Sequence, residues 1–239
     1  MAKFEKVNLL NYPIFFMTKE TKCPYLDNKS EKRLVTDLNN NPFLFDELSL
    51  SGFRRIENWM YRPSCSHCAE CKSYRVNVKN FNLTKSLKRI KKNNSEVSTF
   101  LKNNSASEEY YDLFSNYQHK RHTGSSMSNM TFDDFKSMIE TSPINTQLYE
   151  FRNKEKKLIG LMLFDYQKDG LSAVYSFYDI KFNKNGLGNF MILELISLAK
   201  KLNLEYVYLG YYIKNASRMN YKLKFREGEL FSEGKWTKI

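Results

Sequence analysis

Residues 171–202 read LSAVYSFYDIKFNKNGLGNFMILELISLAKKL, and this stretch decides the fold. Its first part, 171–179, is aromatic and apolar enough to predict a strand. Its last part predicts a helix, because one apolar stripe recurs at helical spacing and Lys200 and Lys201 complement the C-terminal end of the helix dipole. The stripe contains Leu187, Met191, Leu195, Leu198 and Leu202. A strand, a short glycine-containing turn and an amphipathic helix therefore follow one another.

The segments on either side extend this unit. Two helices are predicted upstream, over 108–122 and over 131–140, the second with Thr131 as its N-cap and acidic residues in its first turn. Strands are predicted over 146–152, 156–167 and 205–212, and a further helix or turn over 215–225. The predicted order is helix, helix, three strands, helix, strand.

This order resembles the acyltransferase core of the GNAT type. The turn Asn183-x-x-Gly186-x-Gly188 resembles the loop with which that family holds a pyrophosphate on backbone N–H groups at a helix N-terminus, although a plain tight turn remains the alternative. We therefore expect an α+β protein. Residues 96–239 would form a GNAT-like core with a mixed central sheet flanked by helices, and residues 1–95 a smaller cysteine-containing α+β lobe.

Positive charge is concentrated just before the predicted core. Residues 73–81 (SYRVNVKNF) alternate like a half-buried strand, and the segment 79–92 that overlaps its end contains six Lys or Arg and no acidic residue. Such a segment is either a solvated helix face or a phosphate-binding surface. The residues expected to contact a nucleic acid backbone are Lys85, Lys88, Arg89, Lys91 and Lys92, with Lys214 and Lys222.

The chain has four cysteines, three of them at two-residue spacings. Cys65, Cys68 and Cys71 with Cys23 upstream suit a zinc ion or an iron–sulfur cluster, or else they are packed, metal-free thiols. Both alternatives remain open at this point. A structural disulfide framework is not expected, because the chain is long enough to bury a core.

Composition narrows the class of partner and the compartment. The formal net charge of +12 favours a polyanion, and aromatic residues make up 15% of the chain, which suits base stacking or a buried binding cleft. The first residues, with Lys3, Glu5 and Lys6, do not form a signal peptide, and no apolar segment is long enough to span a membrane. We expect a cytoplasmic protein.

Several segments together resemble one family. They occur in chain order from about residue 12 to residue 236: KCPYL at 22–26, GFRR at 52–55, MYRPSC with its two further cysteines, HKRHTGSSM at 119–127, VYSFYD at 174–179, the segment 206–225 and EGKW at 233–236. This chain is similar to the bacterial aminoacyl-tRNA protein transferases, specifically those that carry leucine. The resemblance implies transfer of leucine from leucyl-tRNA to the α-amine of proteins beginning with Asp or Glu, which marks them for N-degron proteolysis. It implies no membrane and no DNA partner.

The chemistry of that reaction suggests roles for a few residues. An aminoacyl ester is already activated and an α-amine has a pKa of about 7.7 to 8.0, so positioning provides much of the rate and no cofactor is needed. Asp179 would orient the amine or take its proton, unless it only caps a turn. Tyr178 and Tyr211 would donate to the oxyanion or to the leaving ribose oxygen, unless they are ordinary buried tyrosines.

The acceptor's side-chain carboxylate calls for an arginine, whose planar fork matches two oxygens. The arginines in the matching segments are Arg62, Arg75 and Arg121. The alternative for each is a surface ion pair with no role in substrate binding. The cysteine loop would then shape the pocket in which Arg62 or Arg75 lies, with or without a metal.

Other functions stay open on the sequence alone. If arginine is transferred in place of leucine, the family is the same but the donor is arginyl-tRNA. An acetyl-CoA-dependent N-acetyltransferase would use the same core without explaining the basic segment. A non-catalytic RNA-binding protein would explain the charge and the cysteines but not the SFYD and LGYY segments.

Overall fold

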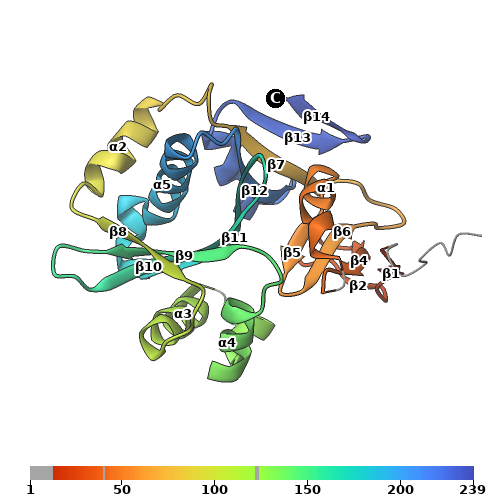
Figure 1. The fold of residues 1–239 in the computed structure, drawn as a ribbon, viewed down its shortest axis with the longest axis horizontal. Helices are drawn as coiled ribbons and strands as arrows, with labels where there is room; N and C mark the ends of the chain where they lie inside the picture. Colours follow the sequence, from red (N-terminus) through yellow and green to blue (C-terminus); the bar gives the residue numbers. More distant parts are fainter. Residues whose placement is uncertain (1–12, 40, 122–123) are drawn as a thin grey trace, which may run out of the picture.

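A large mixed sheet forms the centre of the protein (Figure 1). The computed structural model describes residues 13–39, 41–121 and 124–239, so the charged start with Lys3, Glu5 and Lys6 lies outside the described residues. In spatial order the sheet contains β14 (Lys235–Lys238), β13 (Gly228–Ser232), β7 (Lys72–Asn77), β12 (Tyr206–Tyr212), β11 (Gly170–Tyr178), β10 (Leu158–Tyr166), β9 (Thr146–Arg152) and β8 (Ser98–Asn103). The strands predicted over 146–152, 156–167, 171–179 and 205–212 are confirmed, with small shifts at their ends.

Strand directions make the sheet mixed. β10 pairs antiparallel with both β9 and β11, β12 pairs antiparallel with β7, and β11 pairs with β12 in parallel. Nearly every residue of β10 is buried, because helices cover both faces of the sheet at this strand. The α+β class predicted from the sequence is confirmed at this level of description.

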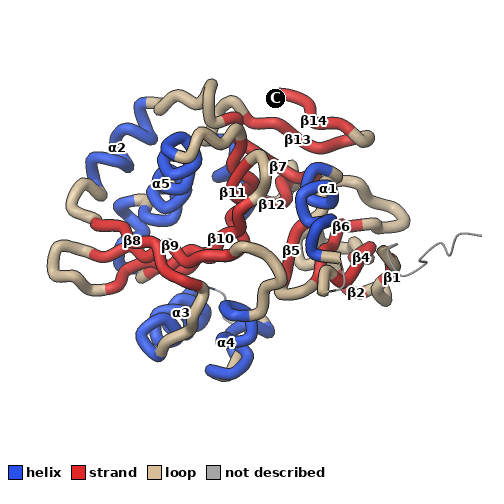
Figure 2. The backbone as a smooth tube through the Cα atoms, in the orientation of Figure 1, coloured by secondary structure: helices blue, strands red, loops and turns tan. Residues whose placement is uncertain are grey.

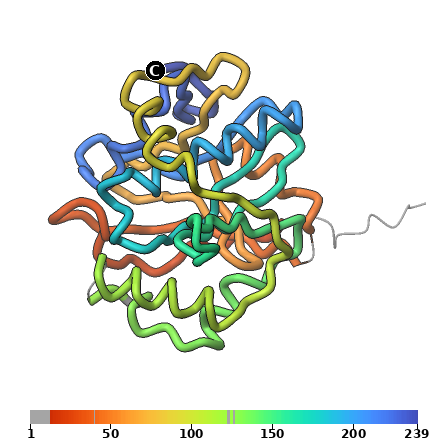
Figure 3. Tube along the Cα trace, turned by 90° about the vertical axis from the view of Figure 1, so that its left-hand side faces the viewer, coloured from red at the N-terminus to blue at the C-terminus, as the bar shows by residue number. Residues whose placement is uncertain are grey.

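Helices lie on the two faces of the sheet (Figures 2 and 3). One face carries α5 (Leu187–Lys201), with α2 (Lys85–Asn93) packed on its outer side, and the other face carries α3 (Glu108–Arg121) and α4 (Phe132–Glu140). Leu187, Met191, Leu195 and Leu198 of the predicted stripe are buried, whereas Leu202 is 44% exposed and follows the helix end. The helix predictions for α3, α4 and α5 are confirmed, and residue 122 of the predicted range 108–122 lies outside the described residues.

The beginning of α4 shows how the sequence sets an element locally. Thr131 accepts a hydrogen bond from the backbone N–H of Asp134, and the Asp134 carboxylate accepts one from the Thr131 N–H, which completes a capping box. These bonds to Thr131 keep the pKa of Asp134 below its usual range. Phe135 and Ile139 then point into the core beneath the sheet.

The first part of the chain forms a second, smaller sheet. Its order is β1 (Phe15–Met17), β4 (Arg33–Asp37), β6 (Trp59–Pro63) and β5 (Arg54–Ile56), and β2 (Thr21–Lys22) pairs with β3 (Ser30–Glu31) beside it. A turn of 3-10 helix, η2 (Pro42–Leu44), leads into α1 (Phe45–Leu50). The residues of its own small core are Leu38, Phe45, Leu48, Phe53 and Met60.

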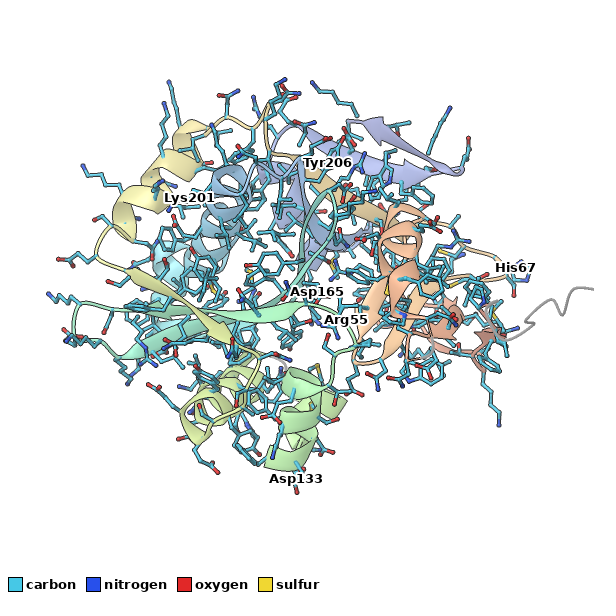
Figure 4. All side chains as sticks on the ribbon, viewed as in Figure 1. Arg55, His67, Asp133, Asp165, Lys201 and Tyr206 are labelled. Atoms are coloured by element: carbon cyan, nitrogen blue, oxygen red, sulfur yellow. The ribbon has the colours of Figure 1, made fainter. Side chains whose placement is uncertain are left out.

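A buried ion pair joins the two sheets. Arg55 of β5 donates from Nε and Nη2 to the two carboxylate oxygens of Asp165 in β10, at 2.8 and 2.7 Å. Thr146 donates its hydroxyl to the same carboxylate at 2.7 Å. Figure 4 shows Arg55 and Asp165 pointing toward one another where the small sheet meets the large one. The guanidinium and the carboxylate are nearly inaccessible to solvent, so this contact is satisfied entirely within the protein.

Some elements were not expected. β8 forms the edge of the large sheet, and the last residues form the hairpin β13–β14, whose turn includes Gly234 at φ +78°. β7 and α2, both before residue 95, belong to the large sheet and its covering layer, while the buried members of the small core lie within 38–60 and Ile144 packs against them. The division of the chain at residue 95 stays a prediction.

Among the described helices, none is long and apolar enough to cross a membrane.

Candidate active site

The parallel strands β11 and β12 separate partway along their length. Their register covers only Gly170 to Ser172 opposite Tyr206 to Tyr208, although β11 continues to Tyr178 and β12 to Tyr212. The residues beyond this point leave backbone groups and side chains facing a split in the middle of the sheet. A split between central strands is a place where a substrate reaches backbone donors and acceptors that the sheet itself does not use.

Arg54 of β5 enters this split from the small sheet. Its Nη2 donates to the carbonyl oxygen of Ala173 in β11 at 2.6 Å, just past the last parallel pair. On the other side, Gly210 of β12 has φ +77°, and a Cβ placed there would lie 3.1 Å from Cζ of Arg54. Glycine is therefore needed at residue 210 both for its backbone conformation and for the close approach of the guanidinium.

A lysine lies beside Arg54. Lys222 belongs to the 3-10 segment η5 (Ser217–Lys224), is 3% exposed and donates its ammonium to the carbonyl oxygen of Tyr211. Burial, and next the nearby charge of Arg54, lower the pKa of Lys222 to about 7. The Lys222 ammonium is turned inward, away from the exposed cations of the predicted tRNA surface, and its contact with the tRNA backbone stays a prediction.

Tyr211 connects the split to the small sheet. Its hydroxyl lies 3.1 Å from the carbonyl oxygen of Gly52 and 3.0 Å from that of Tyr61, and the residue is 8% exposed. Burial is the main cause that raises the pKa of this phenol well above its usual value. The hydroxyl predicted to serve an oxyanion is thus engaged with two backbone carbonyls and helps to hold the small sheet against β12.

The four cysteines come together behind Tyr211. Cys23, Cys65, Cys68 and Cys71 line one cavity, which Ile213 and Tyr25 also border, and all four are free thiols. Burial and the neighbouring thiols raise the pKa of Cys71 to about 12. In the described part of the chain, no three His, Cys, Asp or Glu side chains are placed to hold a metal ion. As placed, the thiols do not fit a metal centre, and no chemical step is assigned to one.

The three arginines predicted to bind the acceptor carboxylate lie in different surroundings. Arg62 donates to the carbonyl oxygen of Ser51 at 3.0 Å and stacks over Phe53. Arg75 donates to Glu229 at 2.7 Å and to the hydroxyl of Tyr208 at 3.1 Å, and lies over Tyr206 and Trp236. Arg121 is exposed at the end of α3, 5.8 Å from the ring centre of Tyr178. Arg75 already has a carboxylate partner, and the three do not converge on one point.

Tyr178 and Asp179 lie at the outer end of β11. The Tyr178 hydroxyl donates to Oδ1 of Asn183 at 3.1 Å, and a Cβ at Gly188 would lie 2.9 Å from the Tyr178 ring. Asp179 accepts a hydrogen bond from the Lys181 N–H at 3.0 Å and caps the 3-10 segment η4 (Ile180–Asn185). At about 3.3 Å per residue, Asp179 is about 20 Å along the chain from Ala173. Tyr178 and Asp179 therefore occupy the opposite end of the split from Arg54.

The basic helix α2 lies next to the beginning of α5. Ile90 of α2 packs against Gly186, and the side chain of Asn94 donates to the carbonyl oxygen of Asn185 at 2.9 Å. The predicted nucleic-acid contacts Lys85, Lys88, Arg89, Lys91 and Lys92 are all exposed, as is Lys214. The helix thus presents a continuous set of cations beside the loop that leads from β11 into α5.

Sequence reasoning missed Arg54 and Gly210, the pair at the split. Both lie in segments that carry the family resemblance, GFRR and YVYLGYY, but neither has a role predicted from the sequence. The signal that was available is a glycine within an otherwise aromatic strand, which indicates the close approach of another group.

Two family models match most of the chain. The family model described as "Arginine-tRNA-protein transferase, C terminus" matches residues 109–232, and "Arginine-tRNA-protein transferase, N terminus" matches residues 21–89. A solved structure, L-PGS from Bacillus licheniformis, superposes with a TM-score of 0.46 at 12% identity over 60% of this chain and 45% of that chain.

Curated relatives are more similar. The aspartate/glutamate leucyltransferase of Granulibacter bethesdensis is 38% identical over 93% of this chain and 84% of its own length. The enzymes of that name from Ruegeria pomeroyi and Paramagnetospirillum magneticum are 39% and 38% identical, covering 94% of this chain and 83% and 93% of their own lengths. This chain is therefore a transferase that belongs to the aspartate/glutamate leucyltransferase family.

Proposed function

We propose that this protein transfers leucine from leucyl-tRNA to the N-terminal α-amine of proteins that begin with Asp or Glu. The observation that carries the proposal is the similarity, at 38% identity over 93% of the chain, to an enzyme named for that activity. The product would carry an N-terminal leucine and enter N-degron proteolysis. The reaction would take place in the cytoplasm, where leucyl-tRNA is made.

The core would act as a GNAT-like acyltransferase. Its parallel strands β11 and β12 part in the middle of the sheet, and α5 begins beside the outer end of β11, which suits a long acyl donor that reaches into the split. The 3′ end of the tRNA would pass the beginning of α5 and bring the leucyl ester into the split. The exposed cations of α2 would contact the tRNA backbone along the way.

The chemical step needs little beyond positioning. The neutral α-amine attacks the carbonyl carbon of the ester, the N–C bond forms and the C–O bond to the ribose breaks, and the proton that the amine loses is taken up by the ribose oxygen. Because the ester is activated and the amine titrates near neutral pH, holding the two groups in contact accounts for much of the acceleration. Neither a metal nor a cofactor is needed for this step.

Tyr178 and Asp179 would serve the donor. At the outer end of β11 they lie beside the loop into α5, where the terminal nucleotide would bind, and Tyr178 is already oriented by Asn183. A role for Asp179 in taking the amine proton is the alternative, and it requires the acceptor to bind at this end of the split. The kinetics of an Asp179→Asn variant separate donor binding from uptake of the amine proton.

The experiment that tests the function is transfer of radiolabelled leucine from leucyl-tRNA to peptides beginning with Asp, Glu, Asn and Arg. Arginyl-tRNA runs alongside, because the matching family model is described as an arginine-tRNA-protein transferase. Leucine on the Asp and Glu peptides alone is the expected result. Transfer of arginine instead of leucine would show that arginyl-tRNA is the donor. Acetyl transfer from acetyl-CoA, with no aminoacyl transfer, would overturn the proposal in favour of an N-acetyltransferase.

A further inference from the structure

Arg54, which is half-buried, differs from the buried arginines Arg55 and Arg75. Arg55 has Asp165 and Arg75 has Glu229 as carboxylate partners. Arg54 takes part in none of the ion pairs among the described residues, and its Nη1 is buried there without any hydrogen-bond partner. A buried guanidinium N–H without a partner costs free energy that a matching acceptor would recover. The protein retains this cost at the point where β11 and β12 separate.

A second basic group, Lys222, lies at the same site. Lys222 also takes part in no ion pair among the described residues. Its ammonium contacts the Tyr211 carbonyl oxygen and the Met219 sulfur and lies 5.4 Å from the ring centre of Tyr221. Arg54 lies close enough to lower the pKa of this ammonium. Two neighbouring basic groups without a counter-charge among the described residues are unfavourable in their charged forms, and an anion bound beside them would offset that cost.

We propose that Arg54, with Lys222 beside it, binds the side-chain carboxylate of the acceptor's N-terminal residue where β11 and β12 separate. This inference rests on the proposed function. The guanidinium fork matches a carboxylate, whereas the amide of Asn would turn N–H donors toward Arg54 and leave them unpaired. The site therefore selects Asp and Glu over their amides.

The burial of the site favours a carboxylate over a tRNA phosphate. Nη1 of Arg54 is inaccessible to solvent and Lys222 is 3% exposed, so neither group lies on an open surface. A backbone phosphate carries a sugar on each side and suits an open surface such as α2, where the cations are exposed. The acceptor carboxylate would thus bind at the split, and the tRNA phosphates would bind at α2.

The experiment compares Arg54→Met, Arg54→Lys and Lys222→Met with wild type. Arg218→Met and Lys224→Met, exposed residues of η5, are matched controls. The readouts are kcat/KM for peptides that begin with Asp or with the isosteric Asn, and KM for leucyl-tRNA. Melting temperatures show which variants are folded, and Arg54→Lys keeps the charge if Arg54→Met does not fold.

In Arg54→Met we expect the Asp-to-Asn ratio of kcat/KM to fall at least about tenfold, which corresponds to removing one charge-assisted hydrogen bond, with KM for leucyl-tRNA unchanged. Arg54→Lys and Lys222→Met should reduce the ratio less, and the controls should keep it. If kcat/KM fell equally for both peptides, so that the Asp-to-Asn ratio did not change, Arg54 would have only a structural role. A raised KM for leucyl-tRNA would show that Arg54 binds a tRNA phosphate. Either result overturns the inference while wild-type transfer still supports the function.

Discussion

Gly210 of β12 and Arg54 of β5 are in direct contact, so closely that a Cβ on residue 210 would lie 3.1 Å from the Arg54 guanidinium carbon. The glycine has φ +77°, and the arginine on its other side bonds the carbonyl of Ala173 in β11. This contact places a residue of the small sheet inside the large one.

Gly210→Ala should destabilise the protein by about 1–3 kcal/mol, because residue 210 has a strained backbone for an L side chain and no room for a methyl group. It should also reduce transfer, because Arg54 has to move. Gly234→Ala is the matched control: Gly234 has φ +78°, and nothing lies within 4 Å of its Cβ position. Chemical denaturation of both variants measures the effect, and equal decreases in stability with equal activity would show that contact with Arg54 is unimportant.

Lys222→Met should raise the free energy of unfolding at about pH 6 by more than about 1 kcal/mol, and the gain should shrink by about pH 9. The pKa of Lys222 is about 7 when folded, below its usual value, so the cost of the buried charge is fully present below that pH. Between there and about pH 10.4 the unfolded chain binds more protons, so wild-type stability rises. Lys224→Met serves as control, and a pH-independent difference would contradict the argument.

Asp179→Asn keeps an oxygen that can accept the Lys181 N–H, so it removes the charge while leaving the cap in place. Because Asp179 lies at the outer end of β11, we expect a higher KM for leucyl-tRNA with kcat changed little and the Asp-to-Asn acceptor ratio preserved. Steady-state kinetics in both substrates measures this. A fall in kcat at constant KM would instead make Asp179 the group that takes the amine proton.

Reversing charge in α2, as Lys88→Glu/Arg89→Glu, should weaken tRNA binding and reduce the slope of log affinity against log salt by about one for each phosphate that the helix no longer binds. Both side chains are exposed, so the fold should be unaffected. Lys136→Glu/Lys168→Glu makes the same change of charge at exposed residues of other elements. If the two double variants change the salt slope equally, α2 contributes only to the net charge of the protein and does not contact the tRNA.

Breaking the Arg55–Asp165 pair should cost about 3–5 kcal/mol in either Arg55→Met or Asp165→Leu, because each leaves a charge buried at the junction of the sheets. The double variant should recover much of that stability. Thermal or denaturant unfolding of the four proteins completes the cycle. Additive effects of the two substitutions would indicate that the two charges do not stabilise one another.

Local patterns in the sequence predicted the elements of the core well. The apolar stripe of α5, the Thr131 N-cap and the strands β9 to β12 depend on residues a few positions apart, and the structure contains each of them. The edge strand β8 and the terminal hairpin β13–β14 were missed, because their patterns are weak and their pairing is with distant segments. The family motifs indicated the class of reaction before any geometry was known.

The sequence by itself determined the order of the helices and strands, the basic helix and the family, because these depend on residues that lie close together in the chain. Only the tertiary structure decided which charges are free. Arg54 meets Ala173 across 119 residues, Arg75 meets Glu229 across 154, and Lys222 is turned inward although Leu223 and Lys224 beside it are exposed. Such pairings follow from how the sheets assemble, since burial and opposing charge are properties of the folded chain.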